Sequence, residues 1–431
     1  MLLNKIRRYS FWVLDFFKGG NLRKNLSDIT FINENFFHPI TEKKREVYLK
    51  NILSHSIKNL NFYNKLKVDS VLEDFPVINK NIIRDNFQDF QAKNHFSKLY
   101  KVTTSGSTGT PFTIYLSKSK KDRNTSDTIY FAKKSGYIVG DKLVYIRLWD
   151  RQHGKSNIEK WIQNILPHDI SNLLDKDIEL LLNKILKYKS GQGILAYASA
   201  FDTIGQYLDK NNLYLTSNIK SIVAISEGLN DYAKSSIKKH FGVIPVSRYS
   251  AVETGIIAQQ GVHSELFTIN WASYFVEILD LNDDKPVEYG QIGRIVVTDL
   301  FNKAMSLIRY DTGDVGVMIL SEDNIPILSR IEGRKMDMLY DVKGELLSSH
   351  VVHEICLFDG IKQYQLIQEG ESEYRFKINV TPDFDNELEL IKTYKEYLGV
   401  DANIEVEYVN SVPLLSSGKR KKVINLHYKN S

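Results

Sequence analysis

The chain reads Thr-Ser-Gly-Ser-Thr-Gly-Thr-Pro at residues 104–111, and no other stretch carries as much chemical information. Gly106 and Gly109 permit positive φ angles, and the hydroxyl side chains compete for backbone hydrogen bonds, so this is neither a helix interior nor a central strand. A loop dense in N–H and O–H donors suits the oxygens of a polyphosphate. A polar surface turn has the same composition, so the loop alone leaves both interpretations open.

The composition is that of an ordinary globular protein. Of 431 residues, 42% are hydrophobic and 25% are charged, and this length is typical of about two or three domains. The net charge of +5 is mild. It permits attraction to anionic ligands or lipid head groups and does not require nucleic acid, so we expect no nucleic-acid partner.

A single cysteine, Cys356, excludes a disulfide framework within the chain and a cysteine-rich zinc site. Its apolar neighbours favour a buried, inert thiol. The cytoplasm is the default compartment for such a chain.

Residues 1–20 combine basic and aromatic side chains. Basic residues at 5–8 precede the apolar run at 9–17, which Asp15 interrupts. The run is too short to span a bilayer and lacks the small-residue cleavage site of a signal peptide. Two interpretations stay open: an amphipathic helix peripheral at the inner face of the membrane, with contact through residues 1–18, or a helix docked on the protein's own core.

Hydrophobic periodicity predicts a layered α/β domain with much parallel sheet, followed by a strand-rich part and a small α+β tail. In the first part, the predicted strands are 142–147, 193–197 and 219–225, and the predicted helices are 43–53, 57–66, 118–136, 178–186, 200–210 and 230–241. In the strand-rich part, which begins near residue 266, the predicted strands are 275–280, 293–298 and 315–320. In the tail, the predicted strands are 338–347, 364–368, 373–380 and 403–409, and the predicted helices are 349–358 and 383–398.

Two segments after the opening loop combine aromatic rings with carboxylates. Residues 247–255 read Ser-Arg-Tyr-Ser-Ala-Val-Glu-Thr-Gly, in which Tyr249 can stack on a purine and Glu253 can hold a phosphate-bound Mg²⁺. Residues 309–314 read Arg-Tyr-Asp-Thr-Gly-Asp, where turn-forming residues put a carboxylate at a strand end, able to accept both hydroxyls of a ribose. A core tyrosine and a plain hairpin turn are the corresponding structural alternatives.

Two more segments lie toward the C-terminus. Gly333-Arg-Lys-Met-Asp337 stands between the two expected domains, and Leu415-Ser-Ser-Gly-Lys419 carries a lysine on a flexible loop. A flexible lysine is a movable positive charge, useful where negative charge builds up on a transferring group. Taken singly, the two segments also fit a charged surface turn and a solvated tail.

In their order along the chain, the five segments resemble the motifs of the adenylate-forming superfamily, which comprises acyl-CoA synthetases, adenylation domains and luciferases. The likeness is closest to phenylacetate–CoA ligase-type proteins, in particular the CapK-type members of capsular polysaccharide pathways, and spans roughly residues 75–425. It implies an α/β fold with a large layered α/β N-terminal domain of the acyl-adenylate synthetase type and a small mobile α+β C-terminal domain. We expect an N-terminal amphipathic segment at 1–20, the adenylating domain at 21–332 and the lid domain at 333–431.

The resemblance further implies an ATP-dependent, AMP-forming ligase. ATP and an aryl, hydroxy, fatty or amino acid would give an acyl-adenylate and pyrophosphate, and the acyl group would pass to coenzyme A, a carrier-protein thiol or an amino-sugar acceptor. The implied cofactors are ATP and Mg²⁺, and the implied pathway is capsule or O-antigen polysaccharide biosynthesis. A catalytically silent, ligase-like scaffold or a membrane-surface assembly protein of the same pathway is the alternative.

The resemblance also implies roles for individual residues. The ATP phosphates would be held by the loop residues Thr104, Ser105, Gly106, Ser107, Thr108 and Gly109, and the adenine would lie against Ser226, Glu227, Gly228, Tyr249 and Ser250. Asp314 would bind the ribose hydroxyls, Arg334 would reach the ribose–phosphate side, and Glu253 would hold Mg²⁺. Lys419 would bridge the carboxylate of the acid and the α-phosphate of ATP. The acyl-pocket candidates are Tyr197, Ala198, Asp202 and Ala251, of which Asp202 can pair with the ammonium group of an amino acid.

Three departures from the family pattern limit this transfer. Thr110 stands where many relatives have a lysine, and the hinge falls on Met336 with Asp337 one residue later. Residues 258–263 lack the cysteines of the metal cluster that some relatives carry, so we expect no zinc.

Overall fold

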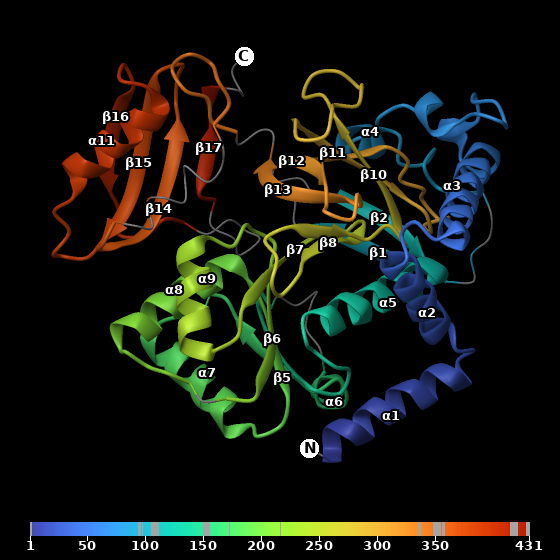
Figure 1. The fold of residues 1–431 in the computed structure, drawn as a ribbon, viewed down its shortest axis with the longest axis horizontal. Coiled ribbons are helices and arrows are strands. Elements are labelled where there is room, and N and C mark those ends of the chain that lie inside the picture. Colours follow the sequence, from blue (N-terminus) through green and yellow to red (C-terminus); the bar gives the residue numbers. More distant parts are fainter. Residues whose placement is uncertain are drawn as a thin grey trace.

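The computed structural model describes residues 2–93, 96, 98–104, 112–149, 156–171, 173–215, 217–334, 338–347, 355, 358–413 and 421–427. Figure 1 shows a large sheet flanked by helices and, at the other end of the chain, a smaller sheet covered by a helix. None of the described helices is long and apolar enough to cross a membrane.

The described helices and strands follow one another in a mixed order along the chain. The helices are α1 (Leu2–Phe17), α2 (Asn21–Glu34), α3 (Pro39–Asn59), η1 (Asn61–Tyr63), η2 (Leu72–Asp74), α4 (Lys80–Asp85), α5 (Lys118–Lys134), α6 (Asn157–Ile162), α7 (Asp175–Lys187), α8 (Ala198–Lys210), α9 (Asp231–Phe241) and α11 (Glu387–Leu398). The strands of the first half are β1 (Leu99–Thr104), β2 (Phe112–Ser117), β3 (Lys142–Arg147), β4 (Ile165–Asp169), β5 (Gln192–Tyr197), β6 (Ile219–Ile225), β7 (Pro245–Ala251) and β8 (Gly255–Gln260). Those of the second half are β9 (Phe267–Ile269), β10 (Tyr274–Leu279), β11 (Ile292–Asp299), β12 (Tyr310–Leu320), β13 (Pro326–Arg334), β14 (Ile361–Gln368), β15 (Glu373–Val380), β16 (Asn403–Tyr408) and β17 (Val423–Asn425).

The large sheet joins a parallel half to an antiparallel half at β7. Its strand order is β10-β11-β12-β13-β9-β8-β7-β6-β5-β3-β4. Strands β4 to β7 pair in parallel, and pairing is antiparallel from β7 onward. Parallel neighbours need long crossover connections, which α7, α8 and α9 supply. The predicted layered α/β architecture is therefore confirmed, and β3 and β6 have the predicted bounds.

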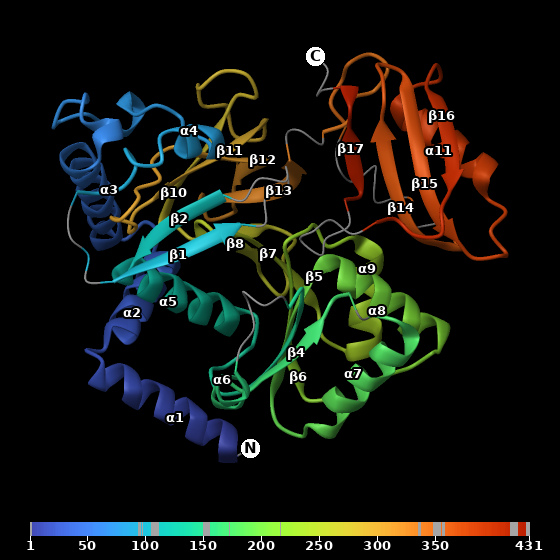
Figure 2. The ribbon, with the colours of Figure 1, turned by 180° about the vertical axis from the view of Figure 1, so that it is seen from behind.

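Two apolar cores hold the two halves of this sheet. Ile178, Leu182, Phe201 and Ile237 of the crossover helices pack with the parallel strands. The antiparallel strands pack instead with α3 and with the β1–β2 hairpin, which lies across them (Figure 2). Each half of the sheet therefore packs on its own apolar core, and the junction at β7 lies between the two cores.

The C-terminal part is a four-stranded sheet in the order β16-β15-β14-β17, with α11 packed on it. This confirms the predicted α+β character of the tail. The boundary between 332 and 333 stays a prediction, since β13 continues to Arg334 and residues 335–337 lie outside the described residues.

Several local predictions are wrong in their bounds or type. Residues 311–313 lie within β12 rather than in a hairpin turn, because Asp311 pairs with Val296 of β11 and Asp314 pairs with Arg334 of β13. The turn chemistry persists locally, since the Gly313 N–H donates to Asp311 Oδ1. Residues 338–347 form no strand but a turn, in which the Asp341 carboxylate accepts backbone N–H groups. The two helices predicted at 43–53 and 57–66 are replaced by the single helix α3, which ends at Asn59. The predicted helix at 349–358 falls mostly outside the described residues.

Candidate active site

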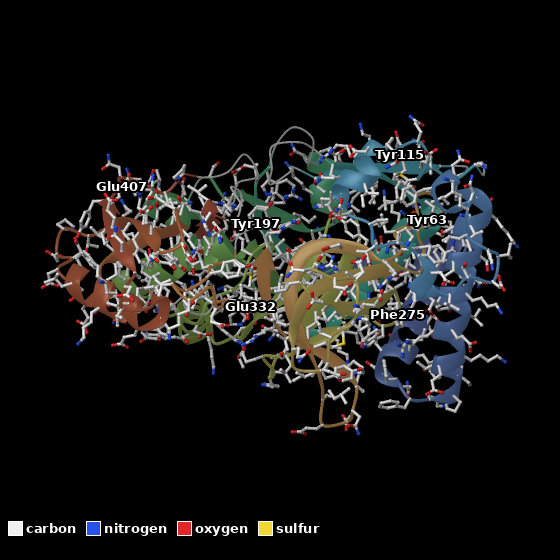
Figure 3. All side chains as sticks on the ribbon, turned by 90° about the horizontal axis from the view of Figure 1, so that it is seen from above. Tyr63, Tyr115, Tyr197, Phe275, Glu332 and Glu407 are labelled. Carbon is white, nitrogen blue, oxygen red and sulfur yellow. The ribbon has the colours of Figure 1, made fainter. Side chains whose placement is uncertain are left out.

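The candidate residues gather where the parallel half of the large sheet meets the antiparallel half. Strands β5, β6 and β7 are parallel, so their carboxyl ends lie at the same edge, which is where α/β sheets bind ligands. Tyr197 ends β5, the segment 226–228 follows β6, and Tyr249 lies near the end of β7. Seen from above, Tyr197 lies near the middle of the molecule, between Glu407 at one end and Tyr63 at the other (Figure 3).

A tyrosine, a carboxylate and a guanidinium form the first cluster at this edge. The Tyr249 hydroxyl donates to Asp314 Oδ2 at 2.9 Å and also contacts Thr312 Oγ1 at 3.1 Å. Arg334 Nε lies 3.1 Å from the other carboxylate oxygen, Asp314 Oδ1. Burial, with the Asp314 charge next to it, raises the pKa of Tyr249, so the phenol keeps its proton and remains a donor. The cluster thus brings together three residues that come from β7, β12 and β13.

The second cluster surrounds Glu253, in the turn between β7 and β8. Its carboxylate is buried, Lys80 Nζ lies 2.8 Å from Oε1, and the Tyr310 hydroxyl donates to the same oxygen at 2.8 Å. Lys80 reaches Glu253 because Ile78 pairs with Tyr310 through an isolated parallel bridge. The turn requires Gly255, whose φ is +108° and whose missing Cβ would lie 2.9 Å from the Tyr274 hydroxyl.

The carboxylate of Glu253 fits a divalent cation. Burial raises its pKa, but the Lys80 ammonium and the Tyr310 hydroxyl outweigh burial, so the pKa of Glu253 lies below its ordinary value. An ionised, oriented carboxylate is the kind of hard oxygen ligand that Mg²⁺ prefers. Because the structure also places an ammonium against it, a cation bound here would have to displace or share the contact with Lys80.

Lys80→Met is expected to lower the free energy of unfolding by an amount that depends on pH. A carboxyl whose pKa is lowered on folding stabilises the fold above its unfolded pKa and loses that contribution as pH falls through the folded value. Without Lys80, burial is the largest remaining influence and raises the pKa of Glu253. The variant should therefore be about 1–3 kcal/mol less stable than wild type near neutral pH, and the deficit should shrink as pH falls.

Urea unfolding at a series of pH values measures this difference. The double variant Lys80→Met/Glu253→Gln has no carboxyl at this position, so its deficit should shrink only below the unfolded pKa of Glu253, where wild type loses the contribution of that carboxylate. The deficit of Lys80→Met should begin to shrink at higher pH, where its own Glu253 takes up a proton. A deficit in Lys80→Met that is the same at every pH would contradict the assigned ion pair.

The segment after β6 differs from the two clusters in being partly open. Ser226 has a φ of 74°, and Ser226 and Gly228 are both exposed. Glu227 points inward: its Oε2 accepts the Ser199 N–H at 3.0 Å, whereas its Oε1 is buried and accepts no hydrogen bond from the described residues. This oxygen is an acceptor left without a donor among the described residues, in the segment that the sequence places next to the adenine.

The acyl-pocket candidates lie close to this segment. Tyr197 and Ala198 are buried, and Ala251 is half-buried in β7, as is its neighbour Ser250. A cavity of about 300 Å³ lies elsewhere, and its lining is Arg84, Phe87, Lys101, Phe112, Thr113 and Tyr115, without any of the predicted pocket residues.

Asp202 is engaged differently from its expected role. Its Oδ1 accepts from Asn230 at 2.7 Å, and its Oδ2 lies 2.9 Å from Lys422 Nζ in the C-terminal part. The carboxylate predicted to meet an amino-acid substrate therefore links α8 to the segment that carries β17.

Several predicted site residues lie outside the described residues: Ser105, Gly106, Ser107, Thr108, Gly109, Met336, Asp337 and Lys419. The strands before and after the phosphate-loop segment are paired, with Thr104 of β1 opposite Phe112 of β2. Thr104 Oγ1 is buried and accepts or donates no hydrogen bond within the described residues.

Lys80 is the site residue that the sequence analysis missed. It stands at the start of α4, remote from every motif, and no periodicity singles it out. The Asn79 N-cap, which accepts from the N–H groups of Asn81 and Ile82, fixes the start of the helix, but only the tertiary fold brings Lys80 to Glu253.

The comparisons with known proteins agree with this geometry. Residues 339–426 match the family model described as the CapK C-terminal domain. Over 408 residues the chain is 23% identical to protein CapK of Staphylococcus aureus, with 90% of this chain and 87% of that protein covered. A shorter match, 23% identical over 185 residues, relates 39% of this chain to 42% of a phenylacetate–coenzyme A ligase of Aromatoleum evansii.

Solved structures give the same class. A 2-hydroxyisobutyryl-CoA ligase in the postadenylation state, in complex with 2-HIB-AMP, aligns with a TM-score of 0.71 at 14% identity over 89% of both chains. In its thioesterification state the same ligase aligns with a TM-score of 0.57.

The fold is that of the ATP-dependent, AMP-forming acyl ligases, with their large N-terminal and smaller C-terminal parts. Within that class, the chain is similar to phenylacetate–CoA ligases and, over most of its length, to CapK, which confirms the resemblance recognised in the sequence.

Proposed function

We propose that this chain activates an organic acid with ATP as an acyl-adenylate, releases pyrophosphate, and passes the acyl group to a thiol or amine acceptor. In the first step a carboxylate oxygen of the acid bonds to the α-phosphorus of ATP while the bond from that phosphorus to the pyrophosphate oxygen breaks. AMP leaves with its electron pair when the acceptor attacks the acyl carbon in the second step.

The cluster of Tyr249, Asp314 and Arg334 is the observation that carries the proposal. It combines an aromatic face, a carboxylate and a guanidinium within hydrogen-bonding distance at the carboxyl edge of the sheet. A ribose has two neighbouring hydroxyls, from which a carboxylate can accept hydrogen bonds. A phosphate has oxygens that can accept hydrogen bonds from a guanidinium. Each oxygen of Asp314 has two lone pairs, so the contacts seen here leave capacity for the hydroxyls.

Glu253 supplies the charge that the triphosphate side of this site needs. Mg²⁺ would be held by the Glu253 carboxylate and would neutralise charge on the phosphate oxygens. Lys80, next to that carboxylate, is a second cation for the same phosphate oxygens. Its Nζ also lies over the ring of Phe112, the residue that follows the predicted phosphate loop. This position compensates for Thr110, which stands where many relatives carry a lysine.

For the acid and the acceptor, we propose chemical classes rather than single compounds. The acid is aryl, hydroxy, fatty or amino, and the acceptor is coenzyme A, a carrier-protein thiol or an amino sugar of capsule or O-antigen biosynthesis. We assign the reaction to the cytoplasm, the compartment that supplies ATP.

The test is exchange of labelled pyrophosphate into ATP in the presence of a panel of aryl, hydroxy, fatty and amino acids. Exchange that depends on one class of acid supports the proposal and names the substrate class. ATP binding without acid-dependent exchange for any member of the panel would instead favour the scaffold alternative.

Asp314→Asn is expected to raise the KM for ATP in that exchange by about 10–100-fold, because the neutral amide accepts the ribose hydroxyls more weakly and no longer attracts Arg334. Asp323→Asn, on the exposed turn after β12, is the matched control and should leave the KM unchanged. An unchanged KM in Asp314→Asn would remove Asp314 from the ATP site.

A further inference from the structure

Helix α1 docks on the protein through its polar side. Asn4 donates to Asp141 Oδ1 at 3.1 Å and accepts from the Tyr188 hydroxyl, and Arg8 Nε donates to the Val139 carbonyl at 3.0 Å. At the other end of the helix, Asp15 is buried and accepts the N–H groups that begin α2. The helix is thus docked on the protein, and the contacts that hold it are polar.

The apolar side of α1 consequently faces solvent. At 3.6 residues per turn, positions 4, 8 and 15 share one face, and positions 2, 6, 13 and 17 lie on the opposite face. The exposed fractions are 50% for Ile6, 52% for Val13, 73% for Phe16 and 79% for Phe17. An outward apolar face on a helix anchored by polar contacts marks an interaction surface, because burying that face elsewhere is favourable.

The surface continues onto α6, a segment far away in the sequence. The Arg7 guanidinium lies over the Trp161 ring, 5.3 Å from its centroid, which fixes α6 beside α1. Figures 1 and 2 both show α6 next to the N-terminal end of α1, along one edge of the molecule. Ile158, Trp161 and Ile162 of α6 are exposed, so two separate elements present apolar side chains at this edge. Tryptophan is enriched where proteins meet the membrane interface.

Basic side chains border this apolar surface. Apart from Arg8, which lies on the docking face, the basic residues of α1, of the link after it and of the start of α2 are Lys5, Arg7, Lys18, Arg23 and Lys24. The acidic residue between them, Asp15, is buried and engaged by backbone N–H groups. On α6 the exposed Glu159 is next to Lys160, so the net charge at this edge is positive.

We propose that α1 and α6 dock the protein on an anionic phospholipid surface, with α1 lying in the plane of the interface. Apolar side chains with a basic border are the combination that binds interfacial helices to acidic membranes. A second copy of the chain fits less well, because a two-fold contact would bring the same basic borders together. The small C-terminal sheet lies on the far side of the molecule from α1, so its movement would not be obstructed by the membrane (Figure 1).

The experiment is co-sedimentation of the full chain with vesicles of phosphatidylglycerol and phosphatidylcholine in equal parts, compared with vesicles of phosphatidylcholine alone. We expect binding to the acidic vesicles that weakens with added salt, and much weaker binding to the neutral ones. Phe16→Glu/Phe17→Glu should lower the partition constant on the order of a hundredfold, because two exposed rings are lost from the interface. Leu388→Glu, an equally exposed apolar position on α11, is the matched control and should bind as wild type does.

A second variant separates charge from apolar burial. Lys5→Glu/Lys18→Glu changes two exposed side chains that hold no described contact in the docking of α1, and it should weaken binding and reduce its dependence on salt. Equal binding of wild type and the phenylalanine variant, or no binding of wild type to acidic vesicles, would overturn the proposal. So would a lipid-free dimer in analytical ultracentrifugation that the phenylalanine variant abolishes. None of these readouts depends on ligase activity, so the failure of one proposal is distinguishable from that of the other.

Discussion

Replacing Lys120 with methionine should destabilise the large domain by about 3–5 kcal/mol, because it leaves a carboxylate buried without its counter-charge. Lys120 and Asp299 are both fully buried, and Lys120 Nζ lies 2.8 Å from Asp299 Oδ2. Lys120 also donates to the Tyr274 hydroxyl at 3.0 Å, and that hydroxyl donates in turn to the Thr254 carbonyl. The loss should therefore reach the turn that holds Glu253.

Urea unfolding followed by circular dichroism measures this loss. Lys118→Met is the matched control on the same helix: it breaks the exposed pair with Asp122 and should cost at most about 1 kcal/mol. In the double variant Lys120→Met/Asp299→Asn, the amide keeps the acceptor for the Phe301 and Asn302 N–H groups but carries no charge, so most of the stability should return. If Lys120→Met lost no more than Lys118→Met, the buried pair would not have the assigned importance.

Lys419→Ala is expected to lower acid-dependent pyrophosphate exchange by about 10²–10³-fold, with ATP affinity almost unchanged. Under the proposed function, the ammonium lies between the attacking carboxylate and the α-phosphate, where negative charge builds up only as the new bond forms. An interaction made mainly in the transition state changes the rate rather than the binding of ATP.

Exchange assays together with equilibrium binding of ATP separate an effect on the rate of adenylation from an effect on ATP affinity. Lys421→Ala, two positions along the same basic run, is the control for a general loss of positive charge and should exchange as wild type does. Undiminished exchange in Lys419→Ala would refute the role of this lysine, whereas equal losses in both variants would indicate a non-specific electrostatic effect.

Local sequence predicted most of the large domain's elements because their signals are local. Apolar, β-branched runs predicted β3 and β6 with their observed bounds, and the amphipathic period of 178–186 predicted the middle of α7. The prediction failed at 311–313, where turn-forming residues lie within β12. There the pairing of Asp311 with Val296 of β11 outweighs the local turn preference, and such a pairing between distant segments has no local signal.

For the candidate site, too, some residues were predicted from local motifs and others were identified only from the fold. The motifs named Tyr249, Glu253, Asp314 and Arg334, and the fold brings Tyr249, Asp314 and Arg334 into one cluster. Lys80 belongs to no motif, and it meets Glu253 only because η2, α4 and β12 pack as they do. The pocket role of Asp202 stays a prediction, and only the fold brings Lys422 of the C-terminal part to its carboxylate.

The sequence by itself determined which chemical groups the chain carries, the order of its motifs and the amphipathic character of α1. The tertiary structure alone decided which groups meet and which side of each helix is buried. The apolar side of α1 faces outward because Asn4 and Arg8 find hydrogen-bond partners near residue 140, a segment that α1 meets only after folding, whereas Asp15 is held by the nearby start of α2. A buried polar group is stable only with such partners, so long-range contacts, not the period of the helix, fixed its orientation.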